Sequence, residues 1–254
     1  LNKDFDVSVF QQVAAHHRSE DHEDADDGEH EWLPLHTGGV ARRLTAGLGE
    51  PSTPALSPDG RWIAFVGRDE QNPEVYLMPA EGGPARRMTW LGPDVMVRGW
   101  TPDGRILFVT TWGQPFFRNY RAFTLGIDGG TPEPIPLGQI NHLAFGPGDA
   151  KVIGRNTADP ARWKRYRGGT TQNIWRYDAG APEAVPLTAD FDGTSKDPLF
   201  WQGRIYFASD RSGKMQIWAH DLKTGKERQI TRHDDYDVKW PSLGPGAIVY
   251  ENGG

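Results

Sequence analysis

The sequence predicts an all-β protein, specifically a β-propeller made of four-stranded blades. Three observations lead to this prediction: a turn motif that recurs at a near-constant step, hydrophobic runs of strand length between the turns, and an excess of turn-forming residues. Gly occurs 31 times and Pro 20 times in 254 residues. Without a collagen-like period, such a composition is typical of many tight turns between short strands.

The recurring turn is the clearest feature of the chain. Residues 57–61 read Ser-Pro-Asp-Gly-Arg, and residues 101–105 read Thr-Pro-Asp-Gly-Arg, 44 positions later. Weaker copies centre on Gly148, Gly203 and Gly246, so successive turn glycines lie 44, 44, 55 and 43 residues apart. Pro fixes φ, Asp bonds the backbone ahead of it, and Gly accepts a positive φ, which suits a tight turn. The long step indicates an insertion between Gly148 and Gly203.

Each repeat reads as four strands in order. A short apolar strand precedes the turn, a hydrophobic run follows it, a third strand comes after a polar turn, and a fourth, more polar strand ends the unit. In the first complete repeat these are residues 54–56, 62–66, 74–78 and 85–89. Four strands in about 40–50 residues, repeated, is typical of a propeller blade. Unrelated hairpins in a sandwich are the alternative, which the matching turn chemistry disfavours.

The sequence leaves the number of blades open. Four complete units cover about residues 50–232, while residues 32–45 supply the last two strands of a unit and residues 238–250 the first two. The two halves could pair into a composite blade and close a five-bladed ring, or the chain could hold an incomplete six-bladed ring. We predict a propeller domain over residues 32–254 and a disordered, acidic, His-rich segment over residues 1–31.

Composition excludes several functions. The formal net charge is −6 and the pI about 5.8, so no overall basic field attracts nucleic acid or anionic lipid. The chain has no Cys, which excludes disulfides and thiolate chemistry. No apolar run approaches the roughly 18 residues that a membrane-spanning helix needs. Residues 1–20 lack the basic and apolar parts of a signal peptide.

We find no catalytic residue, metal site or cofactor motif in the sequence. No Gly-x-Ser-x-Gly elbow and no Gly-x-x-x-x-Gly-Lys loop occurs. The histidines of residues 16–36 stand among many carboxylates, but a solvated tail offers no fixed geometry for a metal, so we interpret this segment as solvated. His142, His220 and His233 are scattered, and we interpret each as a surface or satisfied strand histidine.

One basic cluster could contact a ligand. Arg162, Lys164, Arg165 and Arg167 alternate with aromatic residues inside the predicted insertion. Arginine forks match the geometry of a peptide carboxylate, so these four residues are candidates for peptide binding. The alternative is that the cluster anchors the inserted loop by stacking on aromatic rings or contacts another subunit. Nucleic acid is disfavoured by the net negative charge.

Two sets of residues resemble known families. The Ser-Pro-Asp-Gly-Arg-Trp-Ile-Ala-Phe-Val run beginning at Ser57 resembles the TolB propeller. A more specific pattern is Val-Ile-Gly-Arg-Asn-Thr at 152–157, Arg-Trp-Lys-Arg-Tyr-Arg-Gly-Gly-Thr at 162–170 and Asn-Ile-Trp at 173–175. It resembles the amino-terminal, six-bladed propeller of the tricorn-type peptidases, over about residues 33–254.

The tricorn resemblance implies a non-catalytic module of a large cytosolic serine peptidase. Such enzymes assemble as hexamers and degrade oligopeptides, and their propellers are thought to guide peptides to and from a buried site. Two departures stand out: residues 1–31 do not align, and the connection 91–97 lacks the paired arginines that can hold a peptide carboxyl terminus.

The leading hypothesis is therefore a propeller module that guides oligopeptides within a larger, cytoplasmic and oligomeric peptidase, with no enzymatic activity of its own. Its expected partners are oligopeptides, the remainder of the peptidase chain and further copies of itself, with no cofactor, nucleic acid or membrane. A stand-alone TolB-like propeller that binds proteins is the alternative. A fragment with an unclosed ring is a third possibility, because propellers avoid open edges by pairing their first and last blades.

Overall fold

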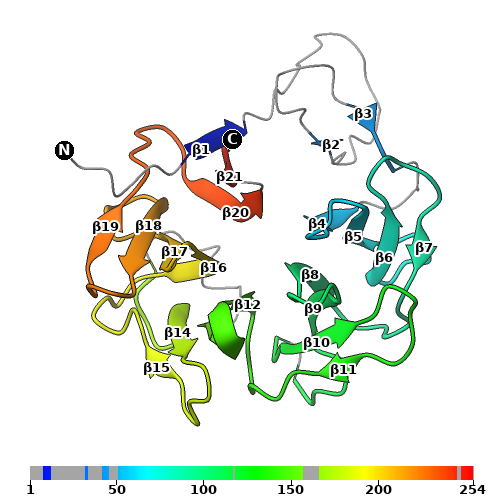
Figure 1. Ribbon diagram of the computed structural model, residues 1–254, viewed down its shortest axis with the longest axis horizontal. Coiled ribbons are helices and arrows are strands. Elements are labelled where there is room, and N and C mark those ends of the chain that lie inside the picture. Colours follow the sequence, from blue (N-terminus) through cyan, green and yellow to red (C-terminus); the bar gives the residue numbers. More distant parts are fainter. Residues whose placement is uncertain are drawn as a thin grey trace. The chain divides into compact units, whose positions relative to one another are not determined.

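The computed structural model describes residues 8–12, 32–33, 42–45, 51–116, 118–156, 166–244 and 247–253. They form strands joined by turns, with a single short 3₁₀ turn, η1 (Pro147–Asp149). The chain divides into two compact units, one of residues 18–140 and one of residues 1–17 with 141–254. Figure 1 labels strands of both units.

The unit of residues 18–140 contains two complete four-stranded antiparallel sheets, each with its strands in chain order. The first sheet consists of β4 (Ser52–Leu56), β5 (Trp62–Gly67), β6 (Glu74–Pro79) and β7 (Arg86–Arg87). The second consists of β8 (Val95–Trp100), β9 (Ile106–Thr110), β10 (Arg121–Leu125) and β11 (Glu133–Pro134). A separate two-stranded pair joins β2 (Trp32–Leu33) to β3 (Arg42–Arg43).

The other unit also contains two complete four-stranded sheets. One consists of β12 (His142–Phe145), β13 (Lys151–Arg155), β14 (Asn173–Tyr177) and β15 (Val185–Pro186). The next consists of β16 (Ser195–Trp201), β17 (Arg204–Ser209), β18 (Gln216–Asp221) and β19 (Glu227–Gln229). A third, three-stranded sheet holds β20 (Val238–Gly244), β21 (Ala247–Asn252) and β1 (Ser8–Gln12).

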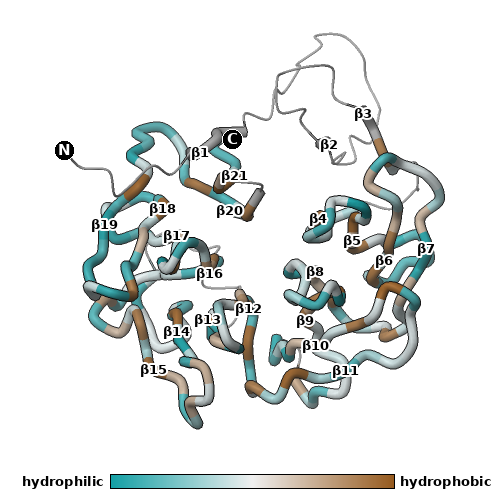
Figure 2. Tube along the Cα trace, viewed as in Figure 1, coloured by the Kyte–Doolittle hydropathy of each residue, from teal (hydrophilic) through white to brown (hydrophobic). Residues whose placement is uncertain are grey.

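The four complete blades expected between about residues 50 and 232 are confirmed. Their second strands carry the hydrophobic runs of the sequence, as the hydropathy colouring of Figure 2 shows for β5. Every residue of β9 is buried, and so is every residue of β5 and β17 except the first of each. Side chains from both complete sheets of residues 18–140 share one apolar core, which includes Val66, Phe108 and Leu125. In the other unit, Ile174 of β14 packs with Ile205 and Phe207 of β17. Burial between neighbouring sheets explains why these strands show continuous hydrophobic runs rather than alternation.

The composite fifth blade is not formed as expected. Residues 247–251 of β21 pair in parallel with residues 8–12, whereas residues 32–33 pair with residues 42–43. The described residues thus contain four complete blades rather than five or six. The third strand of the last sheet is β1, which lies within the segment of residues 1–31 that we predicted to be disordered. Outside Ser8–Gln12, residues 1–31 lie beyond the described ranges, and their disorder stays a prediction.

The predicted turn chemistry is present in detail. Gly60 N donates to Ser57 O at 2.9 Å and Gly60 has a φ of 71°. Asp59 Oδ1 accepts hydrogen bonds from Ser57 Oγ at 2.5 Å and Arg61 N at 3.1 Å. The Ser57 hydroxyl, and then the Arg61 amide, hold the pKa of Asp59 below its ordinary value.

A second repeated feature was not predicted from the sequence. The first strand of three sheets carries a bulge at a residue with positive φ, followed directly by Pro: Thr53 (48°), Asp197 (54°) and Trp240 (46°). β8 also has a register irregularity, between Val97 and Gly99, and there the positive φ (128°) belongs to Gly99, which pairs with Leu107. Pro cannot donate to a ladder, so a bulge on an edge strand is one of the few places in a sheet that accepts it.

Candidate functional site

In each four-stranded sheet, the loop between the second and third strands lies at the same end as the connection to the next sheet. In the β12–β15 sheet, the inserted segment takes the place of that loop. Successive strands run antiparallel, so the loop between the second and third strands leaves from the end at which the connection to the next sheet arrives. We call this end the connection end. In the unit that includes residues 141–254, the described residues of this end are 156, 166–172, 187–194 and 210–215.

The base of the inserted segment is fixed on the connection end. Asn156 is the first residue of the segment after β13 and has a φ of 73°. Its Nδ2 donates a hydrogen bond to Thr171 O at 2.5 Å. Thr171 Oγ1 in turn donates to Gly168 O at 2.5 Å and closes a tight turn. The two described ends of the segment are therefore held together by hydrogen bonds.

Of the four candidate peptide-binding residues, Arg162, Lys164 and Arg165 lie outside the described residues. Arg167 is described, and its side chain makes contacts within the protein. Its Nη1 donates to Asp210 Oδ2 at 2.9 Å, and its guanidinium carbon lies 5.0 Å from the centre of the Phe191 ring. A longer ion pair of 3.5 Å joins its Nε to Asp192. These contacts agree with the anchoring interpretation of this residue, while peptide binding by the cluster stays a prediction.

A second arginine, Arg211, contacts the same phenylalanine, and it was not among the residues predicted from the sequence. Arg211 lies over Phe191 at 5.2 Å, and also over Phe207 and Trp218. It pairs with Glu227, and its side chain is only 10% exposed. Burial lowers the pKa of Arg211 below its ordinary value. Phe191 is thus held between two guanidinium groups, one from the inserted segment and one from the next sheet.

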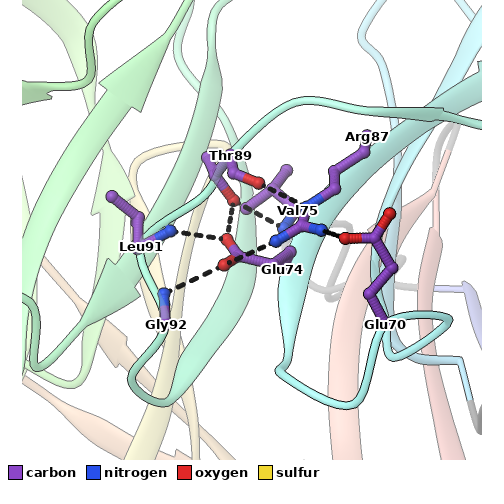
Figure 3. A network of polar contacts seen from close by, with 7 residues as sticks. All are labelled: Glu70, Glu74, Val75, Arg87, Thr89, Leu91 and Gly92. Atoms are coloured by element: carbon purple, nitrogen blue, oxygen red, sulfur yellow. Dashed lines mark hydrogen bonds and ion pairs between the residues drawn. The ribbon is translucent and has the colours of Figure 1, made fainter.

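On the unit of residues 18–140, a buried carboxylate organises the connection end. Glu74, the first residue of β6, is fully buried. Its carboxylate accepts hydrogen bonds from Thr89 Oγ1 at 2.5 Å and from the amides of Leu91 and Gly92 at 3.0 and 2.9 Å (Figure 3). Arg87 donates to the same carboxylate at 3.2 Å and pairs with Glu70 on its other side.

This network holds the connection that lacks paired arginines. The amides of residues 91 and 92 donate to Glu74, so the connection is fixed by its backbone. Beside it, the Trp90 side chain is 71% exposed with Arg87 stacked at 5.3 Å. Trp90 was not identified from the sequence, although its place directly after the fourth strand of a repeat would have put it on the connection end.

The same device recurs in other blades. Thr89, Thr188 and Thr231 each accept a hydrogen bond from the amide of the residue 14 positions earlier, at 2.9, 3.1 and 2.9 Å. In the β16–β19 sheet, Gln216 takes the place of Glu74 and accepts from Thr231 Oγ1 at 2.7 Å. A conserved geometry with a changed charge indicates that the network is structural.

The scattered histidines are satisfied, as expected. His142 Nε2 lies 2.8 Å from Asp197 Oδ1, and His233 Nε2 lies 2.7 Å from the Tyr250 hydroxyl. His220 Nδ1 is 3.4 Å from Glu227, and burial, followed by Arg176 and Arg211, lowers the pKa of His220. The described part of the chain holds no group of three or more His, Asp or Glu side chains placed to bind a metal ion. The His-rich segment lies largely beyond the described residues.

Comparison with known proteins decides the family. A family model described as "Tricorn protease N-terminal beta propeller domain" matches residues 29–254. The chain belongs to this family. The four complete sheets are therefore propeller blades of the tricorn type, and the family's domain is the amino-terminal propeller of a protease.

Individual relatives agree with this assignment. "Tricorn protease homolog 1" of Streptomyces coelicolor is 36% identical over 227 residues, which cover 88% of this chain and 21% of that protein. "Tricorn protease" of Thermoplasma acidophilum is 30% identical, with 85% and 21% covered. The chain thus spans about a fifth of the length of these relatives.

Solved structures show the same fold. "Crystal structure of the tricorn protease" superposes with a TM-score of 0.77 at 28% identity and covers 87% of this chain and 22% of that one. TolB from Acinetobacter baumannii, with a TM-score of 0.64, 19% identity and 85% and 52% of the two chains covered, shares the fold alone. Across the described ranges, the structure contains no helix with the length and apolar character needed to span a bilayer.

Proposed function

We propose that this chain is the amino-terminal propeller module of a tricorn-type oligopeptide-degrading peptidase and that it guides peptides without catalysing their hydrolysis. The observation that carries the proposal is the family match over residues 29–254, together with an inserted segment fixed at the connection end. The module's partners are oligopeptides and the remainder of the peptidase, in a cytoplasmic, hexameric assembly.

The inserted segment supplies the proposed peptide contact. Arg167 and Arg211 both contact Phe191, which holds the carboxyl-terminal end of the segment whose sequence includes Arg162, Lys164 and Arg165. Loops held by a rigid scaffold are the usual carriers of binding residues. A carboxylate of a passing peptide is the group that such cations recognise.

The remainder of the peptidase belongs to the same chain or to a second chain. A relative from Sulfurisphaera tokodaii is named "Putative Tricorn-like protease N-terminal subunit". The match is 33% identical over 144 residues and covers 72% of that protein and 54% of this chain. Its name supports a form of the module that assembles with a separately encoded catalytic partner.

Two assays test the proposal. The chain alone, incubated with fluorogenic oligopeptides, is expected to release no product above buffer; hydrolysis abolished by a serine-directed inhibitor would overturn a non-catalytic role. In the complete peptidase that contains the module, replacing Arg162, Lys164 and Arg165 by Gln is expected to raise KM for oligopeptides roughly tenfold at unchanged kcat, because each lost ion pair weakens binding by a modest amount.

A matched control separates guidance from net charge. Replacing the exposed cations Lys223 and Lys226 of the β18–β19 turn and Arg228 of β19 by Gln makes the same change in charge on the same unit. This triple variant is expected to leave KM unchanged. Equal effects of the two triple variants would contradict a peptide contact at the inserted segment.

A further inference from the structure

The first strands of two neighbouring blades, β12 and β16, meet at a charged contact. They belong to different sheets of the same unit and share no ladder hydrogen bonds. His142 Nε2 lies 2.8 Å from Asp197 Oδ1, and the two side chains are 19% and 9% exposed. At this burial the contact is screened far less by solvent and salt than a surface pair.

The contact is built into the backbone on both sides. Gly154 of β13 lies opposite His142 in the ladder, and a Cβ there would come within 3.2 Å of His142 Cβ and 3.8 Å of Pro198 Cδ. Asp197 is the bulge residue of β16, with a φ of 54° ahead of Pro198. A tight fit on one side and a constrained bulge on the other fix the two groups in register.

Charged side chains of the neighbouring strands lie near His142 and Asp197. On β16, Lys196 Nζ lies 3.7 Å from Asp197 Oδ2. The carboxylate of Asp197 therefore has the lysine ammonium group beside Oδ2 and the imidazole of His142 beside Oδ1. On β13, the residue opposite His142 is a glycine, and the adjacent Arg155 stacks on Trp175 at 5.1 Å. Asp197 is therefore the carboxylate that responds to the charge of His142.

We propose that His142 and Asp197 form a pH-sensitive latch between neighbouring blades. A neutral imidazole can donate one hydrogen bond to the Asp197 carboxylate, whereas an imidazolium adds the attraction of a full positive charge to that bond. Imidazole changes charge near neutral pH, at about 6.5 in unperturbed form. Proton uptake by His142 and closure of the contact thus favour each other, and the latch tightens as the pH falls through this range.

The latch lies at the base of the inserted segment. β13, the ladder partner of β12, ends at Arg155, and the segment starts at Asn156. A tighter β12–β16 contact therefore restrains the strand from which the segment leaves. This property is independent of whether the segment binds peptides.

Hydrogen exchange on the whole 254-residue chain tests the latch. Protection factors, corrected for the intrinsic pH dependence of exchange, are compared at pH 7.5 and 5.5 for β12 and β16. In the parent they are expected to rise roughly fivefold toward acid, because protonation turns the hydrogen bond between His142 and Asp197 into an ion pair. In His142→Gln and Asp197→Asn this rise is expected to vanish.

The control is His233→Gln, which removes a strand histidine whose partner is the neutral Tyr250 hydroxyl. This variant is expected to keep the rise in protection at β12 and β16. A rise that persists in His142→Gln would overturn the proposal. If either variant fails to fold, the parent decides by NMR: a His142 ring that titrates above pH 6.5 supports the latch, and one that titrates below it overturns the latch.

Discussion

Arg167 of the inserted segment donates a 2.9 Å hydrogen bond to Asp210, whose side chain is only 6% exposed. The two residues are 43 positions apart and belong to consecutive blades. Asp210 also accepts from the Thr194 amide at 2.9 Å, so one buried carboxylate joins the inserted segment, the connection between blades and the following blade. The insertion is thus part of the contact between two blades rather than an appendage of one.

Replacing Arg167 by Gln is expected to lower the free energy of unfolding by about 1–2 kcal/mol, because it leaves the buried Asp210 carboxylate without a cation. Arg167 is itself 38% exposed, and solvent screening keeps the effect at this modest size. The inserted segment is also expected to become more sensitive to proteolysis. Urea unfolding and limited trypsin digestion measure the two effects. Lys223→Gln, an exposed cation on the β18–β19 turn, is expected to change neither.

The threonine network allows a comparison of charge at fixed geometry. Thr89→Val removes a hydrogen bond to the buried Glu74 carboxylate and another from Val75 N, and is expected to cost about 3 kcal/mol. Thr231→Val removes the same pair of bonds, but its partner is the neutral amide of Gln216, and the expected cost is about 1–2 kcal/mol. Chemical denaturation compares the two variants. Equal costs would show that Glu74 is no more dependent on its threonine than Gln216 is.

His220 is expected to contribute a loss of stability toward acid, opposite in sign to the gain expected from His142. Burial, then Arg176 and Arg211, holds its pKa below the ordinary value of 6.5, so the unfolded chain binds the proton more tightly than the folded one. The stability that neutral His220 provides is complete above pH 6.5. It falls as the pH drops from 6.5 toward the lower folded-state pKa. Urea unfolding at pH 7.5, 6.5 and 5.5 measures the slope, and His220→Gln is expected to remove this acid loss. An unchanged slope in His220→Gln would assign the acid sensitivity to other groups.

The sequence predicted those parts of the fold that local chemistry controls. Turn glycines such as Gly60 and runs such as Trp62–Gly67 identify the blades, because turn geometry and strand burial depend on residues close in the chain. The pairing of residues 8–12 with 247–251 could not be foreseen, because it joins segments some 240 positions apart and the segment at 8–12 has no strong strand pattern.

In the candidate site, too, the sequence identified residues that stand in a local pattern and missed those that are close only in space. Arg167 was identified because it stands in a dense basic run, and its partners Phe191 and Asp210 were not, because ion pairs between blades leave no local signal. The bulges at Thr53, Asp197 and Trp240 could have been found, since each precedes a Pro at the same point of its repeat. Pro within a strand is the sequence signal of such a bulge.

The turn glycine Gly60 provides a test of backbone strain free of packing effects. Its φ is 71°, and a Cβ added to it would meet no atom within 4 Å. Gly60→Ala is therefore expected to cost about 1 kcal/mol through its left-handed backbone alone. Gly169 is the matched control, because its surroundings are equally open but its φ is not in the left-handed region. Gly169→Ala is expected to be neutral or slightly stabilising, since Ala reduces the freedom of the unfolded chain. Thermal unfolding of both variants decides: a neutral Gly60→Ala would mean that the turn at residues 57–61 adopts another form in solution.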